Sequence, residues 1–190
     1  MEKILKFTEE LEKLKTVTRQ NRTLDPNRQE NSAEHSWHTA VMALMMKHYL
    51  PEDTDINKVV KMLLIHDVVE IDTGDTYLYD EEKRKQAIHK EAIAAERLFG
   101  LLPEPQKQEY LALWKEFEEK LTNEARSAAV LDALQPLINH NVTGTGNPGK
   151  MTRSRVIEKK LFIKDVSPQL WELAEHLINK AVEKGLFLNT

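Results

Sequence analysis

Apolar residues recur at spacings of three and four along almost the whole chain, and this repeat is the strongest constraint on the fold. Near the N-terminus the repeat comprises Ile4, Phe7, Leu11 and Leu14, which share one face of a helix. The alternation of apolar and polar residues that is typical of strands does not occur. The pattern therefore predicts an all-α fold, packed as a helical bundle.

The same repeat predicts further helices, separated by polar or turn-rich segments. Asn31 and Glu34 have the spacing of a capping box, which starts a helix that runs to about Tyr49. The polar stretch from Thr16 to Ser32 is predicted to be a loop, and the stretch 142–149 a connector. Later helices are expected at about 56–71, 81–99, 104–120, 123–141, 151–161 and 167–184. We expect one domain over residues 1–190, with a metal-site core at about 30–140 on which helices at about 151–184 pack.

The composition excludes several classes of protein. The chain has no cysteine, so it has no disulfide, no thiolate metal ligand and no thiol nucleophile. A formal net charge of -4 gives no general attraction to nucleic acid, so an anionic substrate needs local basic groups. The N-terminus lacks the apolar core of a signal peptide, and no apolar run approaches the roughly 20 residues that span a bilayer. We expect a soluble, cytoplasmic protein with no nucleic-acid or membrane partner.

One apolar helix contains ionisable residues where a buried helix should have none. The segment KVVKMLLIHDVVEI, residues 58–71, is apolar on nearly every side and is therefore expected to be buried. His66 and Asp67 lie in its middle, and Glu70 follows His66 by one turn. A buried carboxylate without a partner is costly, so Asp67 needs a cation, a proton or strong donors. For a His-Asp pair on its own, a purely structural role is the alternative.

Two other apolar helices contain similar residues. His35 lies near the start of the helix SAEHSWHTAVMALMM, and Asp132 lies within SAAVLDALQPLI. Pro136 cannot donate the helical hydrogen bond to the Asp132 carbonyl, so a kink is expected there. Two imidazoles and two carboxylates in apolar surroundings suit a borderline divalent ion. The predicted ligands of one such ion are His35, His66, Asp67 and Asp132.

The order of these residues resembles the H…HD…D signature of the HD superfamily of metal-dependent phosphohydrolases. The segment RQENSAEH, residues 28–35, is similar to the segment around the first metal ligand in the bacterial 5′-deoxynucleotidase group. HDVVEIDTGD, residues 66–75, resembles that group's HDxxExxxGD motif. The resemblance spans about residues 10–140. It implies a helical fold, one divalent ion (Mn, Co, Mg, Ni, Fe or Zn) and hydrolysis of nucleoside 5′-monophosphates by a homodimer.

The resemblance also implies roles for residues around the metal. Glu70 matches the acid that orients or deprotonates the attacking water, and Asp75 matches a second acid, which protonates the leaving oxygen or binds the sugar. For Asp75 a solvated loop carboxylate is the alternative. Arg19 aligns with the phosphate-binding arginine, apart from a one-residue difference in length. The group has a tryptophan after that arginine, whereas this chain has Gln20, which removes the basis for a strict deoxyribose preference.

Other residues and functions remain open at this point. Arg28 is either a phosphate ligand or a structural partner of Glu30 or Glu34. His38 is expected to be a packed core residue, with support of the metal ligands as the alternative, and Met42, Met45 and Met46 are expected in the core. The alternatives to a nucleotidase are hydrolysis of a triphosphate, a modified nucleotide or an alarmone, and a non-enzymatic binding module that a metal staples together.

Overall fold

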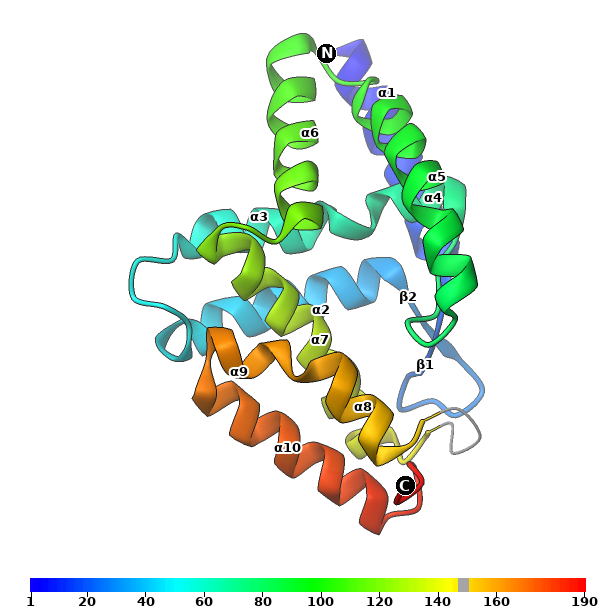
Figure 1. Ribbon diagram of the computed structural model, residues 1–190. Helices are drawn as coiled ribbons and strands as arrows, with labels where there is room; N and C mark the ends of the chain where they lie inside the picture. The colour runs from blue at the N-terminus through cyan, green and yellow to red at the C-terminus, as the bar shows by residue number, and fades with distance from the viewer. Residues whose placement is uncertain (147–150) are drawn as a thin grey trace.

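The computed structural model describes residues 1–146 and 151–190, which are helical apart from one small hairpin (Figure 1). The expectation of an all-α fold is confirmed. Part of the expected connector at 142–149 lies outside the described residues. No helix in the described part of the chain is both long and apolar enough to cross a membrane. The helices are α1 (Glu2–Leu11), α2 (Ser32–Met46), α3 (Ile56–Ile65), α4 (Glu70–Thr73), α5 (Glu81–Phe99), α6 (Glu104–Glu119), α7 (Asn123–Thr143), α8 (Arg153–Lys160), α9 (Phe162–Val166) and α10 (Pro168–Glu183).

Side-chain caps set the starts of several helices. Asn31 accepts a hydrogen bond from the Glu34 amide at 2.9 Å, and Glu34 accepts one from the Asn31 amide at 3.2 Å, which completes the capping box of α2. Other polar residues with side chains that accept amide hydrogen bonds precede α3, α5, α7, α8 and α10; they are Asp55, Asp80, Thr122, Thr152 and Ser167. The sequence therefore specifies where each of these helices begins.

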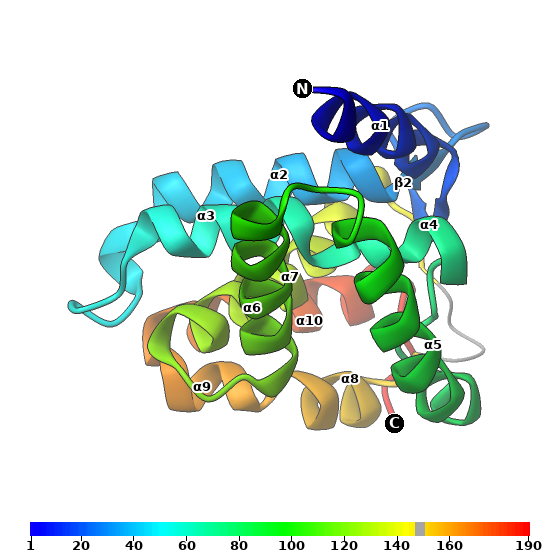
Figure 2. The same cartoon turned by 90° about the horizontal axis from the view of Figure 1, so that it is seen from above.

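Helix α7 is the central element of the structure. Helices α2 and α3 pack side by side and both contact α7, whereas α9 and α10 pack on its opposite side (Figures 1 and 2). Helices α1, α5 and α6 form a further group, which meets the rest where α6 contacts α7 and α3 and where α5 contacts α4. Buried apolar side chains from all these groups form one continuous cluster, from Phe7 near the N-terminus to Phe187 near the C-terminus.

The stretch from Thr16 to Ser32 is not the simple loop that its polar composition predicts. It contains β1 (Thr18–Arg22) and β2 (Gln29–Asn31), which pair antiparallel, with Thr18 opposite Asn31 and Arg22 opposite Gln29. The strands have no apolar alternation because their buried side chains are polar, Asn21 and Glu30. Ion pairs and hydrogen bonds, rather than an apolar face, hold this hairpin against the helices.

The helix expected at 56–71 is interrupted at His66 and Asp67, two of the predicted metal ligands. Helix α3 ends at Ile65, a 3₁₀ turn spans His66–Val69, and α4 follows until Gly74, which has a φ of 72°. The tighter turn changes the directions of the side chains at this point relative to a continuous α-helix. The expectation that the segment 58–71 is buried holds for most of its apolar residues but not for Leu64, which is exposed.

One face of α2 carries exposed apolar side chains. Trp37, Leu44 and Met45 are 64%, 54% and 75% exposed, whereas Met42 is buried in the core. The placement of Met45 in the core was therefore wrong, because it lies on the face of α2 away from α7. A patch of this kind on a small protein usually has a partner.

We propose that the chain unfolds as a single cooperative domain, since its C-terminal helices share one core with the rest. Ile178 of α10 is fully buried in this core, so Ile178→Ala should lower the free energy of unfolding by about 2–5 kcal/mol. Ile93→Ala is the control, because Ile93 is 58% exposed on α5. Urea denaturation followed by far-ultraviolet circular dichroism measures both variants. Two separate transitions in the wild type would contradict the proposal.

Candidate metal centre and active site

His35 projects from the second turn of α2 into the interior, where its ring orientation is fixed by α7. Gln135 donates through Nε2 to Glu30 Oε1 at 2.7 Å, so its Oε1 must face His35 Nδ1, which lies 3.1 Å away. Because the amide oxygen only accepts, Nδ1 of His35 carries the proton. The other ring nitrogen of His35, Nε2, faces the cluster and lies 2.9 Å from Asp132 Oδ1.

His66 is oriented in the same way by the backbone. Its Nδ1 lies 2.8 Å from the Leu63 carbonyl oxygen, and this bond assigns the proton to Nδ1. Its Nε2 is buried and has no hydrogen-bond partner. Asp67 Oδ1 lies 3.1 Å from Nε2, but not in the direction of a hydrogen bond, and Asp132 Oδ1 lies 3.8 Å away. A buried Nε2 without a hydrogen-bond partner fits the role of a metal ligand.

The ligand atoms of His35, His66 and Asp132 all lie within 4.8 Å of one another. Two imidazole lone pairs and one carboxylate oxygen, which come from α2, the 3₁₀ turn and α7, fit a divalent metal ion. Asp132 is less enclosed than its apolar sequence context predicts, since 35% of its side-chain surface is exposed, and it lines the cavity described below. When bound, such an ion polarises phosphoryl oxygens and lowers the pKa of its water.

Electrostatics favour a cation within this cluster. Burial lowers the pKa of His66, but the carboxylates of Asp67 and Asp132 outweigh it and raise that pKa to about 9. Burial raises the pKa of Asp132, but the imidazoles of His35 and His66 hold it well below its usual range. The negative potential that retains a proton on His66 equally attracts a metal ion, which must displace that proton to bind.

Asp67 is the one predicted ligand outside the cluster. Its Oδ2 accepts a hydrogen bond from Arg19 Nη1 at 2.9 Å, and the same nitrogen lies 3.5 Å from Asp75 Oδ1. Arg19, on β1, is only 14% exposed, and its Nε lies 3.7 Å from Glu30 Oε2. Arg19 therefore neutralises the acids on one side of the cluster.

Glu70 and Asp75 both lie next to Asp67. Glu70 is buried and accepts a hydrogen bond from the Ser32 hydroxyl at 2.5 Å. Burial, together with the charges of Asp67 and Asp75, raises the pKa of Glu70 well above its usual value, although Arg19 opposes this. Burial also raises the pKa of Asp75, which is 11% exposed and hence not a freely solvated loop carboxylate. Two buried carboxyl groups with raised pKa values are suited to acid–base chemistry.

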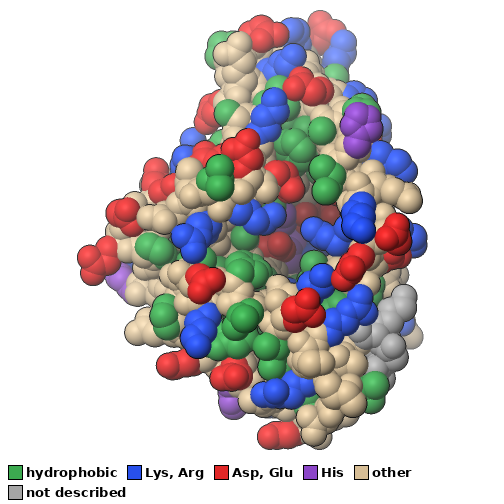
Figure 3. All heavy atoms as spheres, in the orientation of Figure 1, with side chains coloured by type: hydrophobic (Ala, Val, Ile, Leu, Met, Phe, Trp, Pro, Cys, Tyr) green, Lys and Arg blue, Asp and Glu red, His purple; other side chains and the backbone are tan. Residues whose placement is uncertain are grey.

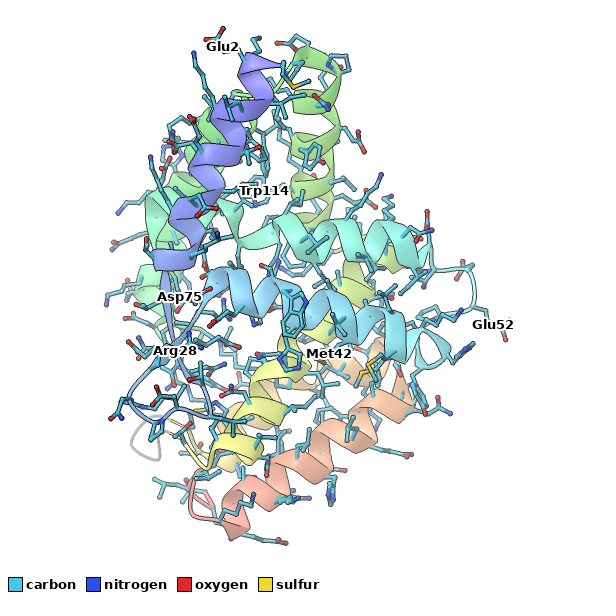
Figure 4. The ribbon with its side chains drawn as sticks, turned by 180° about the vertical axis from the view of Figure 1, so that it is seen from behind. Glu2, Arg28, Met42, Glu52, Asp75 and Trp114 are labelled. Atoms are coloured by element: carbon cyan, nitrogen blue, oxygen red, sulfur yellow. The ribbon has the colours of Figure 1, made fainter. Side chains whose placement is uncertain are left out.

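Arg28 and His38 lie in the vicinity of the cluster but do not contact its ligands. Arg28 binds both carboxylate oxygens of Glu34, at 2.8 and 2.9 Å, so it is a structural partner of Glu34 rather than a phosphate ligand. Figure 4 labels Arg28 and Asp75 on the side of the molecule where the hairpin lies. His38 is half-buried and its Nδ1 lies 3.3 Å from Gln135 Nε2. It therefore supports the residue that orients His35, and the expectation of a simple core residue is wrong.

The cluster opens into a cavity of about 170 Å³. Figure 3 shows a hollow in this face of the molecule, with acidic and histidine side chains at its floor and basic side chains around it. The cavity lining includes Arg19, Gln20, Asp67, Glu70, Asp75, Tyr77, Tyr79, Arg84, Asp132, Pro136 and Lys160. The hollow is thus polar on its floor and has cations within reach, as a site for an anionic ligand requires.

Sequence reasoning missed three residues that contribute to this site. Gln135 follows Asp132 by three positions on α7 and so shares its face, a spacing that would have suggested a role. Ser32, which binds Glu70, was visible only as part of a helix start. Lys160 lies on α8, beyond residues 10–140, and no pattern in the sequence indicates that it reaches the cavity.

Known proteins provide an independent comparison. The chain is 33% identical over 111 residues to 5′-deoxynucleotidase HDDC2 of Xenopus laevis, a match that covers 57% of this chain and 53% of that protein. It is 28% identical over 156 residues to 5′-deoxynucleotidase HDDC2 of Danio rerio, which covers 80% and 76% of the two chains. The chain thus spans about half the length of the curated relatives that it matches at the highest identity.

Solved structures extend the likeness to the whole chain. A crystal structure described as a predicted metal-dependent phosphohydrolase from Magnetospirillum magnetotacticum MS-1 is 44% identical, with a TM-score of 0.89 and coverage of 98% of this chain and 97% of that one. A conserved hypothetical protein from Pyrococcus furiosus shares the fold at 22% identity, with a TM-score of 0.69 and coverage of 92% and 99%. The model of the HD domain family matches residues 11–171. The resemblance seen in the sequence is confirmed: this chain belongs to the HD domain family.

Proposed function

We propose that the chain is a metal-dependent phosphohydrolase that releases phosphate from nucleoside or deoxynucleoside 5′-monophosphates. The observation that carries the proposal is the position of Glu70 and Asp75, two largely buried carboxyl groups beside the His35–His66–Asp132 cluster at the floor of a cavity. A metal site that only staples helices together needs neither acid. The 5′-deoxynucleotidase names of the relatives support a nucleotide as the substrate.

In the proposed reaction the two acids have separate tasks. Glu70 takes a proton from the water whose oxygen forms the new bond to phosphorus. Asp75 gives a proton to the 5′-oxygen of the sugar as the bond between that oxygen and phosphorus breaks. The raised pKa values of both groups suit these transfers, because a base is most effective when its pKa lies near the working pH, and an acid must retain its proton until it is needed.

We further propose Asp67 as the fourth ligand of the ion. Its Oδ1 lies 3.1 Å from His66 Nε2, so a rotation of its side chain would bring this oxygen toward the cluster while Oδ2 stays with Arg19. Two nitrogens and two carboxylate oxygens accept Mn, Co, Ni, Fe or Zn more readily than the harder Mg ion. Reconstitution with each metal in turn, followed by activity measurements, identifies the ion.

Product analysis identifies the class of substrate. A metal-reconstituted sample incubated with all nucleoside monophosphates, with triphosphates and with modified nucleotides, and analysed for released phosphate and pyrophosphate, tests it directly. Phosphate release from a monophosphate supports the proposal. Products from triphosphates, modified nucleotides or alarmones alone would move the chain to another activity of the HD superfamily, and no products at all would favour a binding module.

A pair of variants separates metal binding from chemistry. Asp67→Ala should purify with much less metal than the wild type, because it removes one ligand charge. Glu70→Gln should retain the metal and the fold but lose at least ~100-fold in kcat, the usual scale for a general base. Elemental analysis after gel filtration and steady-state kinetics measure both effects. Full metal content in Asp67→Ala would leave Asp67 as a partner of Arg19 alone, and wild-type turnover by Glu70→Gln would exclude it as the base.

We expect Arg19 to contact the phosphate with the donors that Asp67 and Asp75 leave free. Arg19→Ala should therefore raise KM for a nucleoside monophosphate by at least ~10-fold. Arg28→Ala is the matched control on the same hairpin, and it should leave KM unchanged because Arg28 pairs with Glu34.

Since Gln20 replaces the tryptophan of the deoxynucleotidase group, AMP and dAMP should differ by less than ~10-fold in kcat/KM, about 1.4 kcal/mol. A strong preference for dAMP would show that another residue excludes the ribose 2′-hydroxyl.

We also propose that the chain forms a homodimer through the exposed apolar face of α2. Trp37, Leu44 and Met45 lie on this face, and an aromatic residue with a methionine is typical of the centre of a protein interface. Light scattering after gel filtration should give twice the chain mass of 22.0 kDa for the wild type and the monomer mass for Met45→Glu. A monomeric wild type at micromolar concentration would contradict the proposal.

A further inference from the structure

Lys160 is buried, which is unusual for a lysine. It is the last residue of α8, only 5% of its surface is exposed, and it lines the same cavity as Asp132 of the metal cluster. None of the carboxylates of the described residues forms an ion pair with it. Lysine is almost never buried to this degree without a partner, because the loss of hydration is costly for an ammonium group.

The neighbouring charges do not provide that partner. Asp132 is the acid whose charge acts on Lys160, but its Oδ1 is bound by His35 at 2.9 Å. Arg19 and Arg84, which also line the cavity, are like charges and repel the ammonium group. An ammonium group has three donors, and no described residue accepts a hydrogen bond from any of them. These donors are left for a ligand in the cavity.

Lys160 remains charged under physiological conditions despite its burial. Burial lowers the pKa of Lys160 to about 8, and Arg19 and Arg84 act in the same direction, whereas Asp132 opposes them. At neutral pH most molecules therefore carry the positive charge. An anion in the cavity would strengthen this charge and would in turn be held by it.

The charge balance of the cavity indicates how much negative charge a ligand can bring. Its lining contains four carboxylates, Asp67, Glu70, Asp75 and Asp132, against the three cations Arg19, Arg84 and Lys160. A divalent ion at the cluster shifts this balance toward positive charge. Without Lys160 a dianionic phosphate would enter a cavity with one positive charge fewer to attract it.

We propose that Lys160 binds the phosphate group of the substrate from the wall of the cavity that the C-terminal helices form. The inference rests on the proposed function in naming a phosphate monoester, but the site itself is defined by a buried, unpartnered cation. The phosphate then lies between the metal cluster, contributed by α2, α7 and the 3₁₀ turn, and the ammonium group of α8. This position complements Arg19, whose charge is already shared between Asp67 and Asp75.

Calorimetry with inorganic phosphate on the metal-loaded protein tests the proposal without turnover. Lys160→Met keeps the length and apolar part of the side chain and removes its charge. This variant should bind phosphate at least 10-fold more weakly, about 1.4 kcal/mol, and should raise KM for the best nucleoside monophosphate by a similar factor. Its Tm should equal or exceed that of the wild type, because an unpaired buried charge is lost. Elemental analysis should find equal metal in both proteins.

Lys159→Met provides the matched control. Lys159 precedes Lys160 on α8 but pairs with Glu81 at 3.0 Å and does not line the cavity, so its substitution should change phosphate binding less than 2-fold. Unchanged phosphate affinity in Lys160→Met, or an equal loss in Lys159→Met, would overturn the inference. If the wild type hydrolyses no nucleoside monophosphate and yet Lys160→Met loses phosphate affinity, the inference stands and the proposed substrate is wrong.

Discussion

Four carboxylates converge on one small cavity, and the need to compensate their charge explains most of what surrounds them. Unpaired acids at this depth would destabilise the fold, so positive charges or hydrogen-bond donors lie beside them. Arg19 reaches in from β1 to Asp67 and Asp75, and His35 approaches Asp132 from α2. The hairpin therefore packs on the helices through charge, which is consistent with its lack of an apolar face. The same concentration of negative charge makes the cluster a site for a divalent cation.

Hydrogen bonds behind the imidazoles decide which nitrogen faces the cavity. The Leu63 carbonyl binds Nδ1 of His66, and Gln135 binds Nδ1 of His35, so both rings present Nε2. Gln135 is held in turn by Glu30 of β2, which links the hairpin to α7 through a buried amide. Such outer contacts usually matter for metal affinity almost as much as the ligands themselves, because they fix the tautomer and the ring plane. In this chain they also connect the hairpin, α2 and α7 into one unit.

The cavity is built from more of the chain than the metal site alone. The cluster comes from the segment that the sequence marks as a metal-site core, but Arg19 precedes that core and Lys160 follows it. Helix α8 reaches the cavity because the C-terminal helices pack on α7, the same helix that carries Asp132. Because α7 carries Asp132 on one face and packs against the C-terminal helices, it brings the C-terminal segment to the cavity that Asp132 lines. The proposed phosphate contact depends on this arrangement.

The sequence by itself determined most of the helices and their capped starts, and it marked His35, His66 and Asp132, which the structure brings together. Helical spacing, a capping box at Asn31 and ionisable residues in apolar helices are local patterns. Such patterns can be recognised in the sequence without knowledge of the fold. Only the tertiary structure decided which charges meet: that Arg19 binds Asp67, that Gln135 orients His35 and that Lys160 enters the cavity. These contacts join residues that are 48 and 100 positions apart in the chain for Arg19–Asp67 and His35–Gln135. No spacing rule reports such pairs, because packing of helices against α7, rather than any local preference, brings them together.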